Sequence, residues 1–164
     1  MEIRVEDTAD WPAAHAIHKA AFQRTSEAEL VRRMRDDGDL ILSLTAHADR
    51  PAGHVAFSRL VLRDNLTLAG CALAPLAVIP ELQGQGIGSA LVREGLERLA
   101  EDGYDLVVVL GEPDYYRRFG FTPALASRLK TPYDGPYLQA LALSEKGKQA
   151  HGPVSYARAF AELK

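Results

Sequence analysis

Three glycines lie within five positions of this chain, at Gly84, Gly86 and Gly88, and a serine follows them at Ser89. Glycine lets the backbone approach a ligand closely, because it has no side chain. The first N–H groups of a helix are unpaired and favour negative charge, so a glycine-rich loop that leads into a helix can bind phosphate groups. The sequence therefore predicts a phosphate-binding loop at residues 83–89.

Two well-known phosphate-binding motifs can be compared with this loop. A P-loop requires a lysine directly after its last glycine, and here Ser89 follows Gly88, so this motif is excluded. A Rossmann fingerprint requires G-x-G-x-x-G; Gly84 and Gly86 fit it, but Ser89 stands at the third glycine position. Glu112 lies where the ribose-binding acid of that fold would be. A nicotinamide-dependent oxidoreductase therefore stays open as an alternative.

A longer stretch of sequence resembles one particular family. The pattern Gln-x-x-Gly-x-Gly, at Gln83, Gly86 and Gly88, resembles the acetyl-CoA signature of the GNAT N-acetyltransferases, and residues 75–82 strengthen the match. A second stretch, Tyr116-Arg117-Arg118-Phe119-Gly120-Phe121, resembles the family's Tyr-x-x-x-Gly-Phe motif, and residues 110–116 are similar to its YhbS-like branch. The resemblance implies a mixed α/β GNAT fold, in which a twisted, mostly antiparallel central sheet splays at the cofactor strand between flanking helices.

The same resemblance implies which residues hold acetyl-CoA. Backbone groups of Leu76 and Val78 would bind the thioester carbonyl and the pantetheine arm, beside a bulge at Pro75 that opens the sheet. The glycine loop would hold the pyrophosphate, and two aromatic residues of the second motif would lie next to the cofactor. The implied cofactor-binding residues are Leu76, Ala77, Val78, Gln83, Gly84, Gln85, Gly86, Ile87, Gly88, Ser89, Tyr115 and Phe119.

Tyr116 occupies the position of the family's general acid, where a phenol with a pKa of about 10 would return a proton to the departing thiolate. An alternative is that its ring only packs against the pantetheine arm. The cofactor strand carries no acidic residue, so the general base has to come from elsewhere. His54 is the candidate because the pKa of histidine suits proton transfer near neutral pH, with a structural role as the alternative. Glu112 and Asp114 are further candidates for the base.

The acceptor would be a primary amine of a small molecule or a peptide. Glu27 and Glu29, in the first turn of a predicted helix, would attract a cationic amine, although carboxylates at this place also stabilise the helix dipole. A non-catalytic acyl-CoA-binding module is the competing function, because the cofactor strand lacks an acid. His15 and His18 have the spacing of a metal-binding pair, but no third ligand accompanies them, and no metal site is expected.

The predicted elements place these residues at the end of a sheet. Strands expected at 40–46, 54–62 and 66–78 form an antiparallel meander before the glycine loop, which a doubly wound nucleotide fold lacks. A helix follows the loop and is ended by Gly103; its predicted buried side consists of Ile87, Leu91, Val92, Leu96 and Leu99. The other expected elements are a strand at 3–5, a helix at 11–22 capped by Asp10, a helix at 27–35 with a capping box of Ser26 and Glu29, a strand at 106–110, a short helix capped by Asp114 and ended by Gly120, extended chain from Phe121, a strand at 137–143 and a short return at 152–156.

Composition sets the remaining bounds. A chain of 164 residues with 47% hydrophobic and 25% charged residues is expected to fold as one domain, residues 1–164. A net charge of −3 with scattered arginines argues against a nucleic-acid partner. The first residues lack the apolar segment of a signal peptide, and no apolar run has the length of a membrane span.

Cys71 is the single cysteine of the chain, which predicts a cytoplasmic protein without an internal disulfide. A lone cysteine in an apolar strand is interpreted as a core residue, with a nucleophile as the alternative. The sequence leaves both a monomer and a homodimer open.

Overall fold

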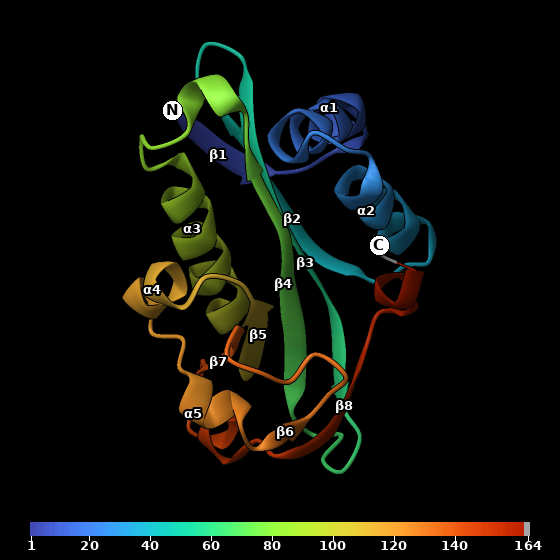
Figure 1. Cartoon of the computed structure of the whole chain (residues 1–164), viewed down its shortest axis with the longest axis vertical. Coiled ribbons are helices and arrows are strands. Elements are labelled where there is room, and N and C mark those ends of the chain that lie inside the picture. Colours follow the sequence, from blue (N-terminus) through green and yellow to red (C-terminus); the bar gives the residue numbers. More distant parts are fainter. Residues whose placement is uncertain (163–164) are drawn as a thin grey trace. The chain divides into compact units, whose positions relative to one another are not determined.

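The computed structural model describes residues 1–162 of the chain (Figure 1). These residues form two compact units: the first contains residues 1–58, 75–95 and 157–162, and the second contains Arg59–Ala74 and Leu96–Tyr156. Three elements contribute residues to both units, namely β3 (Pro51–Leu62), β4 (Ala69–Val78) and α3 (Ile87–Glu101).

The other strands are β1 (Glu2–Val5), β2 (Leu40–His47), β5 (Leu106–Leu110), β6 (Leu129–Lys130), β7 (Leu138–Ala142) and β8 (Gly152–Tyr156). The other α-helices are α1 (Trp11–Phe22), α2 (Ser26–Asp36), α4 (Pro113–Tyr116) and α5 (Pro123–Ala126). Short 3-10 helices are at Thr8–Asp10, Pro80–Leu82, Arg117–Phe119, Lys146–Gln149 and Arg158–Glu162. Within residues 1–162, no helix combines the length and the apolar character that crossing a membrane requires.

The strands are hydrogen-bonded in the order β1-β2-β3-β4-β5-β7. The pairs β1–β2, β2–β3 and β5–β7 are antiparallel, and β4–β5 is parallel. Strand β8 pairs antiparallel with the end of β3 and parallel with β6. The expected mixed α/β fold with a mostly antiparallel sheet and flanking helices is thereby confirmed.

In the first unit, α3 packs very closely on β3. A Cβ atom at Gly95 of α3 would lie 2.4 Å from the ring of Phe57, and one at Gly53 of β3 would lie 2.9 Å from Cδ1 of Leu91. Both glycines are therefore needed for this close approach of helix and strand. The predicted buried residues Ile87, Leu91, Val92 and Leu99 of α3 are buried, and Leu96 is half-buried.

Other residues of the first unit pack against α1 and α2. Leu30, Val31 and Met34 of α2 form a cluster with Ala56 of β3. Ile17 of α1 forms another cluster with Ala77 of β4 and Ile79, which follows that strand. Because side chains alternate along a strand, Ala56 and Phe57 point to opposite faces of β3.

Through the contact of Ile17 with Ala77, helix α1 reaches the end of β4, where the sequence predicts the acyl group to bind.

In the second unit, an apolar core joins β3, β4, β5, β7 and β8 to α5. Its buried members are Leu60, Leu62, Leu68, Ala72, Leu106, Val108, Ala126, Leu129, Leu138, Ala140, Ala150 and Val154. The parallel register of β4 and β5 runs from Gly70–Leu106 to Leu73–Val109. Strand β4 continues beyond this register to Val78. The apolar composition of β5 explains why its bounds were predictable, since a parallel strand is covered on both faces.

The predicted N-cap of α1 has the right position but makes no side-chain cap hydrogen bond, and the predicted capping box of α2 is wrong. Asp10 stands at the N-cap of α1 without a side-chain cap hydrogen bond, because its carboxylate accepts two hydrogen bonds from Arg4, at 2.9 and 3.0 Å, and one from the backbone N–H of Asp7. For α2 the N-cap is Thr25, and the expected capping box of Ser26 and Glu29 is absent. The Glu29 carboxylate instead accepts hydrogen bonds from Arg32.

Two further differences concern the second unit. The N-cap of α4 is Glu112 and not Asp114, because Pro113 already takes the first helical position. Asp114 lies within the first turn and forms an ion pair of 2.8 Å with Arg117. The chain after Phe121 was expected to be extended, but residues Pro123–Ala126 form α5. Its N-cap Thr122 accepts a hydrogen bond from the backbone N–H of Leu125.

Candidate functional site

The glycine loop joins β4 to α3 through the 3-10 helix Pro80–Leu82. Gly84 and Gly86 have φ angles of +78° and +88°, which only glycine adopts without strain. Residues 83–86 are exposed, and no atom lies within 4 Å of a Cβ built on Gly84 or Gly86. The backbone conformation of the loop therefore requires glycine, and the space around it is open to a ligand.

The start of α3 supplies hydrogen-bond donors to this loop. Ile87 is the first residue of the helix, and the first N–H groups of an α-helix have no partner within the helix. Such groups, together with the helix dipole, favour a phosphate or another anion. The exposed loop and these donors fit a pyrophosphate-bearing cofactor.

Gln83 has a role in the loop that the sequence did not reveal. Its side-chain Nε2 donates a hydrogen bond of 2.9 Å to the carbonyl oxygen of Val78, the last residue of β4. This bond holds the beginning of the loop against the end of the strand. The spacing of the motif gave no signal for it, because the partner is a backbone atom.

Strand β4 presents its end residues alternately. Pro75 and Ala77 are buried, whereas Leu76 and Val78 are half-buried. The register with β5 ends at Leu73, before Pro75. The bulge at Pro75 and the use of the Leu76, Ala77 and Val78 backbone in cofactor binding stay predictions.

Tyr116 ends α4 in the second unit and is 9% exposed. Its ring makes edge-to-face contacts with Tyr115 and Phe121, at centroid distances of 5.0 and 5.7 Å. Burial, and then the neighbouring Tyr115, raises the pKa of the Tyr116 phenol above its ordinary value, so the group stays protonated at neutral pH. The ring of Tyr115 also contacts Phe119 and lies under the guanidinium of Arg118.

Gly111 determines where the Tyr116 ring can lie, which sequence analysis missed. A Cβ atom at Gly111 would lie 2.5 Å from Cε2 of Tyr116. A side chain at this position is therefore incompatible with the observed place of the ring. The glycine before Glu112 is the only signal in the sequence, and it carries no information on its partner.

His54 lies within β3 of the first unit and is completely buried. Its Nδ1 is 2.8 Å from Nε2 of His18, and its Nε2 is 3.1 Å from Oε1 of Glu6. The same Glu6 oxygen accepts a hydrogen bond of 2.8 Å from Nη2 of Arg35. We call these four residues the His18–Arg35 chain. His18 and Glu6 were not predicted as partners of His54, because they are distant from it in sequence.

The stability of the protein is expected to fall in weak acid because of His18. Burial, followed by the charges of His54, His15 and Arg35, lowers the pKa of His18 well below its ordinary value. As the pH drops below about 6.5, the unfolded chain gains a proton at this residue and the folded chain does not. The free energy of unfolding therefore decreases as the pH falls, by up to about 1.4 kcal/mol per pH unit for this one proton.

Urea unfolding of the parent and of His18→Gln, from about pH 7.5 down to about pH 5, measures this effect. The parent should lose more stability over this range than the variant, which has no titrating ring at position 18. Equal losses in the two proteins would contradict the assignment of the lowered pKa to His18.

The two acidic residues predicted to attract an amine lie on α2. Glu27 is nearly buried, and its Oε1 accepts a hydrogen bond of 2.9 Å from Nε of Arg24. Glu29 is paired with Arg32, and that hydrogen bond lowers the pKa of Glu29. Both carboxylates thus have arginine partners with which a cationic substrate would compete.

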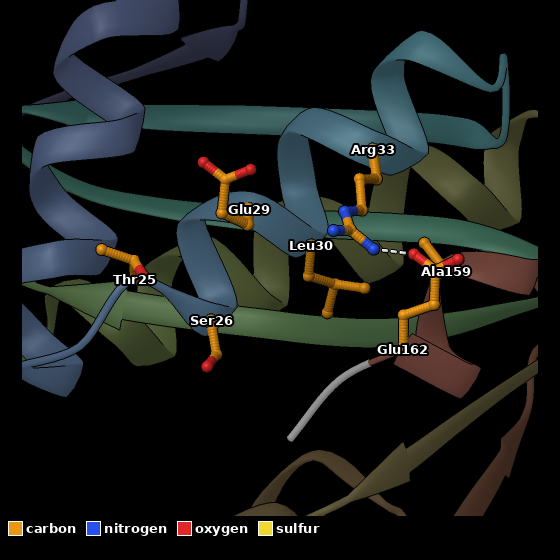
Figure 2. Close-up of a pocket in the computed structure, with 7 residues that line it drawn as sticks. All are labelled: Thr25, Ser26, Glu29, Leu30, Arg33, Ala159 and Glu162. Carbon is orange, nitrogen blue, oxygen red and sulfur yellow. Dashed lines mark ion pairs between the residues drawn. The ribbon is translucent and has the colours of Figure 1, made fainter.

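Glu29 also lines a pocket of about 280 Å³ in the first unit (Figure 2). The lining residues are Thr25, Ser26, Glu29, Leu30, Arg33, Ala159 and Glu162. Figure 2 shows the Arg33 side chain directed toward Glu162, with which it forms an ion pair. The pocket therefore has a charged wall that is internally neutralised.

The remaining candidates are placed as follows. Cys71 is buried, and burial raises the pKa of its thiol, which agrees with a core residue and disfavours a nucleophilic thiolate. Glu112 and Asp114, the alternative bases, are exposed at the start of α4. Within the part of the chain that the structure describes, no group of three or more His, Cys, Asp or Glu side chains is arranged to hold a metal ion.

Known proteins resemble this chain in both sequence and structure. Residues 2–124 match the family model described as an acetyltransferase (GNAT) domain. The chain is 43% identical over 138 residues to the uncharacterized N-acetyltransferase YhbS of Escherichia coli K12, covering 82% of this chain and 81% of YhbS. It is 36% identical over 137 residues to the uncharacterized N-acetyltransferase YjhQ of the same strain, covering 81% and 74% of the two chains.

Two solved structures are similar over nearly the whole chain. The crystal structure of YhbS from Escherichia coli in complex with CoA has a TM-score of 0.90 and 38% identity, covering 98% of this chain and 91% of that one. A GNAT-family acetyltransferase from Brucella melitensis in complex with acetyl-CoA has a TM-score of 0.83 and 34% identity, covering 97% of each chain. These matches set aside the nicotinamide-dependent alternative. Since the family model and both relatives cover well over half of the sequence, the chain belongs to the GNAT acetyltransferase family.

Proposed function

We propose that this protein transfers the acetyl group of acetyl-CoA to a primary amine of a small molecule or a peptide, and that its two units form one acetyltransferase domain. The observation that carries the proposal is the exposed loop before α3, in which Gly84 and Gly86 have positive φ angles within a Gln-x-x-Gly-x-Gly pattern. The CoA and acetyl-CoA complexes of the two similar structures support the same cofactor. The single Cys71, which is buried and unpaired, agrees with a cytoplasmic location.

The proposed cofactor site combines backbone and side-chain groups. The N–H groups of the loop and of the first turn of α3 would bind the pyrophosphate, with Gln83 holding the loop on Val78. The backbone at Leu76–Val78 would bind the acyl end, with Tyr115 and Phe119 as further cofactor contacts. Bound acetyl-CoA supplies a thioester whose carbonyl carbon an amine can attack, with release of the thiol.

Tyr116 is the proposed general acid for the departing thiolate, and its raised pKa means that the phenol carries the needed proton at neutral pH. His54 is proposed to belong to the route that removes the proton of the acceptor ammonium. Glu27 and Glu29 would attract the cationic acceptor to α2 in exchange for their arginine partners.

We expect Gly111→Ala to slow acetyl transfer, because the added Cβ would displace the ring of Tyr116. A displacement of about 1 Å can cost on the order of 10²-fold in rate. The matched control is Gly95→Ala, whose Cβ would lie 2.4 Å from the ring of Phe57 in the core of the first unit. Both variants should lose stability by overpacking.

Turnover per folded molecule separates these two variants. The rate should fall in Gly111→Ala and remain close to the parent's in Gly95→Ala, once the folded fraction has been measured by circular dichroism. Equal rates in the two variants would show that Gly111 matters only for stability.

The competing function is an acyl-CoA-binding module without catalysis. It is favoured by the absence of an acidic residue along β4, Ala69–Val78, and by the arginine partners of Glu27 and Glu29. Thiol release from acetyl-CoA across a panel of polyamines, amino acids, aminoglycosides and peptides distinguishes the two functions. Release that requires an amine supports the transferase; tight CoA binding without release across the panel would support the binding module.

A further inference from the structure

A buried chain of polar side chains lies between α1, α2 and β3 in the first unit. It consists of His18, His54, Glu6 and Arg35, joined in this order by contacts of 2.8, 3.1 and 2.8 Å. Both histidines are 0% exposed, and the side chains of Glu6 and Arg35 are 6% and 16% exposed. Polar groups that are buried to this extent must be matched donor to acceptor, so the positions of their protons can be deduced.

Arg35, at one end of the His18–Arg35 chain, is always protonated. Its Nη2 donates to Oε1 of Glu6, so the carboxylate is ionised and can only accept hydrogen bonds. Nε2 of His54, at 3.1 Å from the same oxygen, must therefore carry a proton. In a neutral imidazole the other nitrogen is then an acceptor, so Nδ1 of His54 accepts a hydrogen bond.

The acceptor at Nδ1 of His54 fixes the tautomer of His18. Its Nε2 lies 2.8 Å from Nδ1 of His54 and must be the donor. Nδ1 of His18 is then left as the basic lone pair of the chain. This atom is buried and has no hydrogen-bond partner among residues 1–162. The basic nitrogen of His54 thus already accepts a hydrogen bond from His18, and the free basic nitrogen of the His18–Arg35 chain is Nδ1 of His18.

His18 lies on the part of α1 that packs against the end of β4. Ile17, its neighbour on α1, packs against Ala77 of β4 and against Ile79. Ala77 belongs to the segment of β4 at which we propose the acyl group to bind. The ring of His18 also stacks on Phe22, with centroids 6.2 Å apart and planes within 10°, which holds its orientation.

We propose that His18 Nδ1 accepts the proton of the acceptor ammonium through one bridging water, with His54 as the residue that takes up the positive charge and Glu6 as a positioning residue; this inference rests on the proposed acetyl transfer. As His18 gains this proton on Nδ1, its Nε2 proton passes to Nδ1 of His54. His18 is neutral again in its other tautomer, and His54 becomes an imidazolium ion. One proton has entered the His18–Arg35 chain, and the positive charge that leaves the amine resides on His54 beside the Glu6 carboxylate.

The charges around the two rings favour this direction of transfer. A cation on His18 is disfavoured by burial and by His54, His15 and Arg35, and these effects lower the pKa of His18. A cation on His54 is adjacent to Glu6, at 3.1 Å. The His18–Arg35 chain thus moves the positive charge from the ring of His18, where it is disfavoured, to the ring of His54, which has a carboxylate partner.

The proton positions can be measured without any substrate. Long-range ¹H–¹⁵N spectra of the full chain labelled with ¹⁵N in its histidines distinguish the two tautomers, with assignment by the variants His18→Gln and His54→Gln. The expected result near neutral pH is a proton on Nε2 of both rings. A proton on Nδ1 of His18 in the resting protein would overturn the proposal.

The kinetic test uses His18→Gln, because a glutamine amide can still donate to His54 Nδ1 but has no basic nitrogen. The rate is followed by thiol release with the panel amine that the parent acetylates fastest. His18→Gln should lose about 10²-fold or more in rate together with the acidic limb of the rate–pH profile, while its melting temperature and CoA affinity stay near the parent's. The control, His15→Gln, removes a histidine of the same helix that makes none of these contacts; it should keep a near-parental rate and retain the acidic limb, which should move to slightly higher pH because the charge of His15 no longer lowers the pKa of His18.

Glu6→Gln tests the positioning role of the carboxylate. Without its negative charge the imidazolium of His54 that forms during the transfer is less stable, so kcat should fall while the KM for acetyl-CoA stays near the parent's. A parental rate and pH profile in His18→Gln would overturn the proposal. A parent that acetylates no amine of the panel would instead remove the proposed function, and the tautomers would show separately whether the deduced arrangement of protons is correct.

Discussion

Gly86→Val should abolish CoA binding while leaving the fold largely intact. Gly86 has a φ angle of +88°, in a region that β-branched residues avoid, so valine would force the loop into another conformation. Apart from the two neighbouring residues, no atom lies within 4 Å of a Cβ at this position, so the added Cβ itself meets no other part of the protein. The expected loss in CoA affinity is about 10²-fold or more, which corresponds to roughly 2.8 kcal/mol.

The control for this variant is Gly103→Val, near the opposite end of α3. Gly103 has the same φ angle of +88°, and again no atom lies within 4 Å of its Cβ position. The backbone strain is therefore matched, while the site differs. Calorimetric titration with CoA should show lost affinity only for Gly86→Val. Equal affinities in the two variants would contradict the assignment of the loop as the pyrophosphate site.

Tyr116→Phe should slow the chemical step by about 10²-fold or more, because it removes only the hydroxyl group of the proposed general acid. The ring contacts with Tyr115 and Phe121 do not involve this hydroxyl and should persist. CoA affinity and the melting temperature should therefore stay close to those of the parent. Single-turnover rates with saturating acetyl-CoA measure the effect on the step itself.

Tyr115→Phe is the matched control for Tyr116→Phe. Tyr115 is the preceding residue on α4, is half-buried, and keeps its ring contact with Phe119 when its hydroxyl is removed. Its rate should remain near the parent's. Near-parental rates in both variants would mean that Tyr116 packs against the cofactor and does not donate the proton.

The sequence predicted most elements of the fold because their signals are local. Strand β5, Leu106–Leu110, has the predicted bounds, because every residue of this short run is apolar and the run is therefore recognisable as a buried strand. Gly103 and Gly120 end their helices as predicted, with φ angles of +88° and +100°, because left-handed caps favour glycine. Asp10 stands at the predicted N-cap of α1, but its carboxylate accepts hydrogen bonds from Arg4 of β1 and makes none to its own helix.

The candidate site divides in the same way. The glycine loop was found from sequence because its motif is contiguous and its conformation depends on the glycines themselves. The partners of His54 are separated from it by 36 and 48 residues, and although His18 shares the apolar side of its helix with Ala14, no local pattern pairs it or Glu6 with His54. Likewise, the packing of Tyr116 on Gly111 depends on side-chain geometry that no spacing encodes.

Transfer of an acetyl group from acetyl-CoA to an amine is the proposed reaction of this chain. The most direct measurement follows an isotope-labelled acetyl group by mass spectrometry after incubation of the full chain with labelled acetyl-CoA and the amine panel. We expect the label to appear on one amine in amounts equal to the free CoA released, and Tyr116→Phe to suppress both products together. Label that remains on CoA in the presence of every amine, despite tight CoA binding, or that appears only as free acetate, would contradict the proposed acetyl transfer.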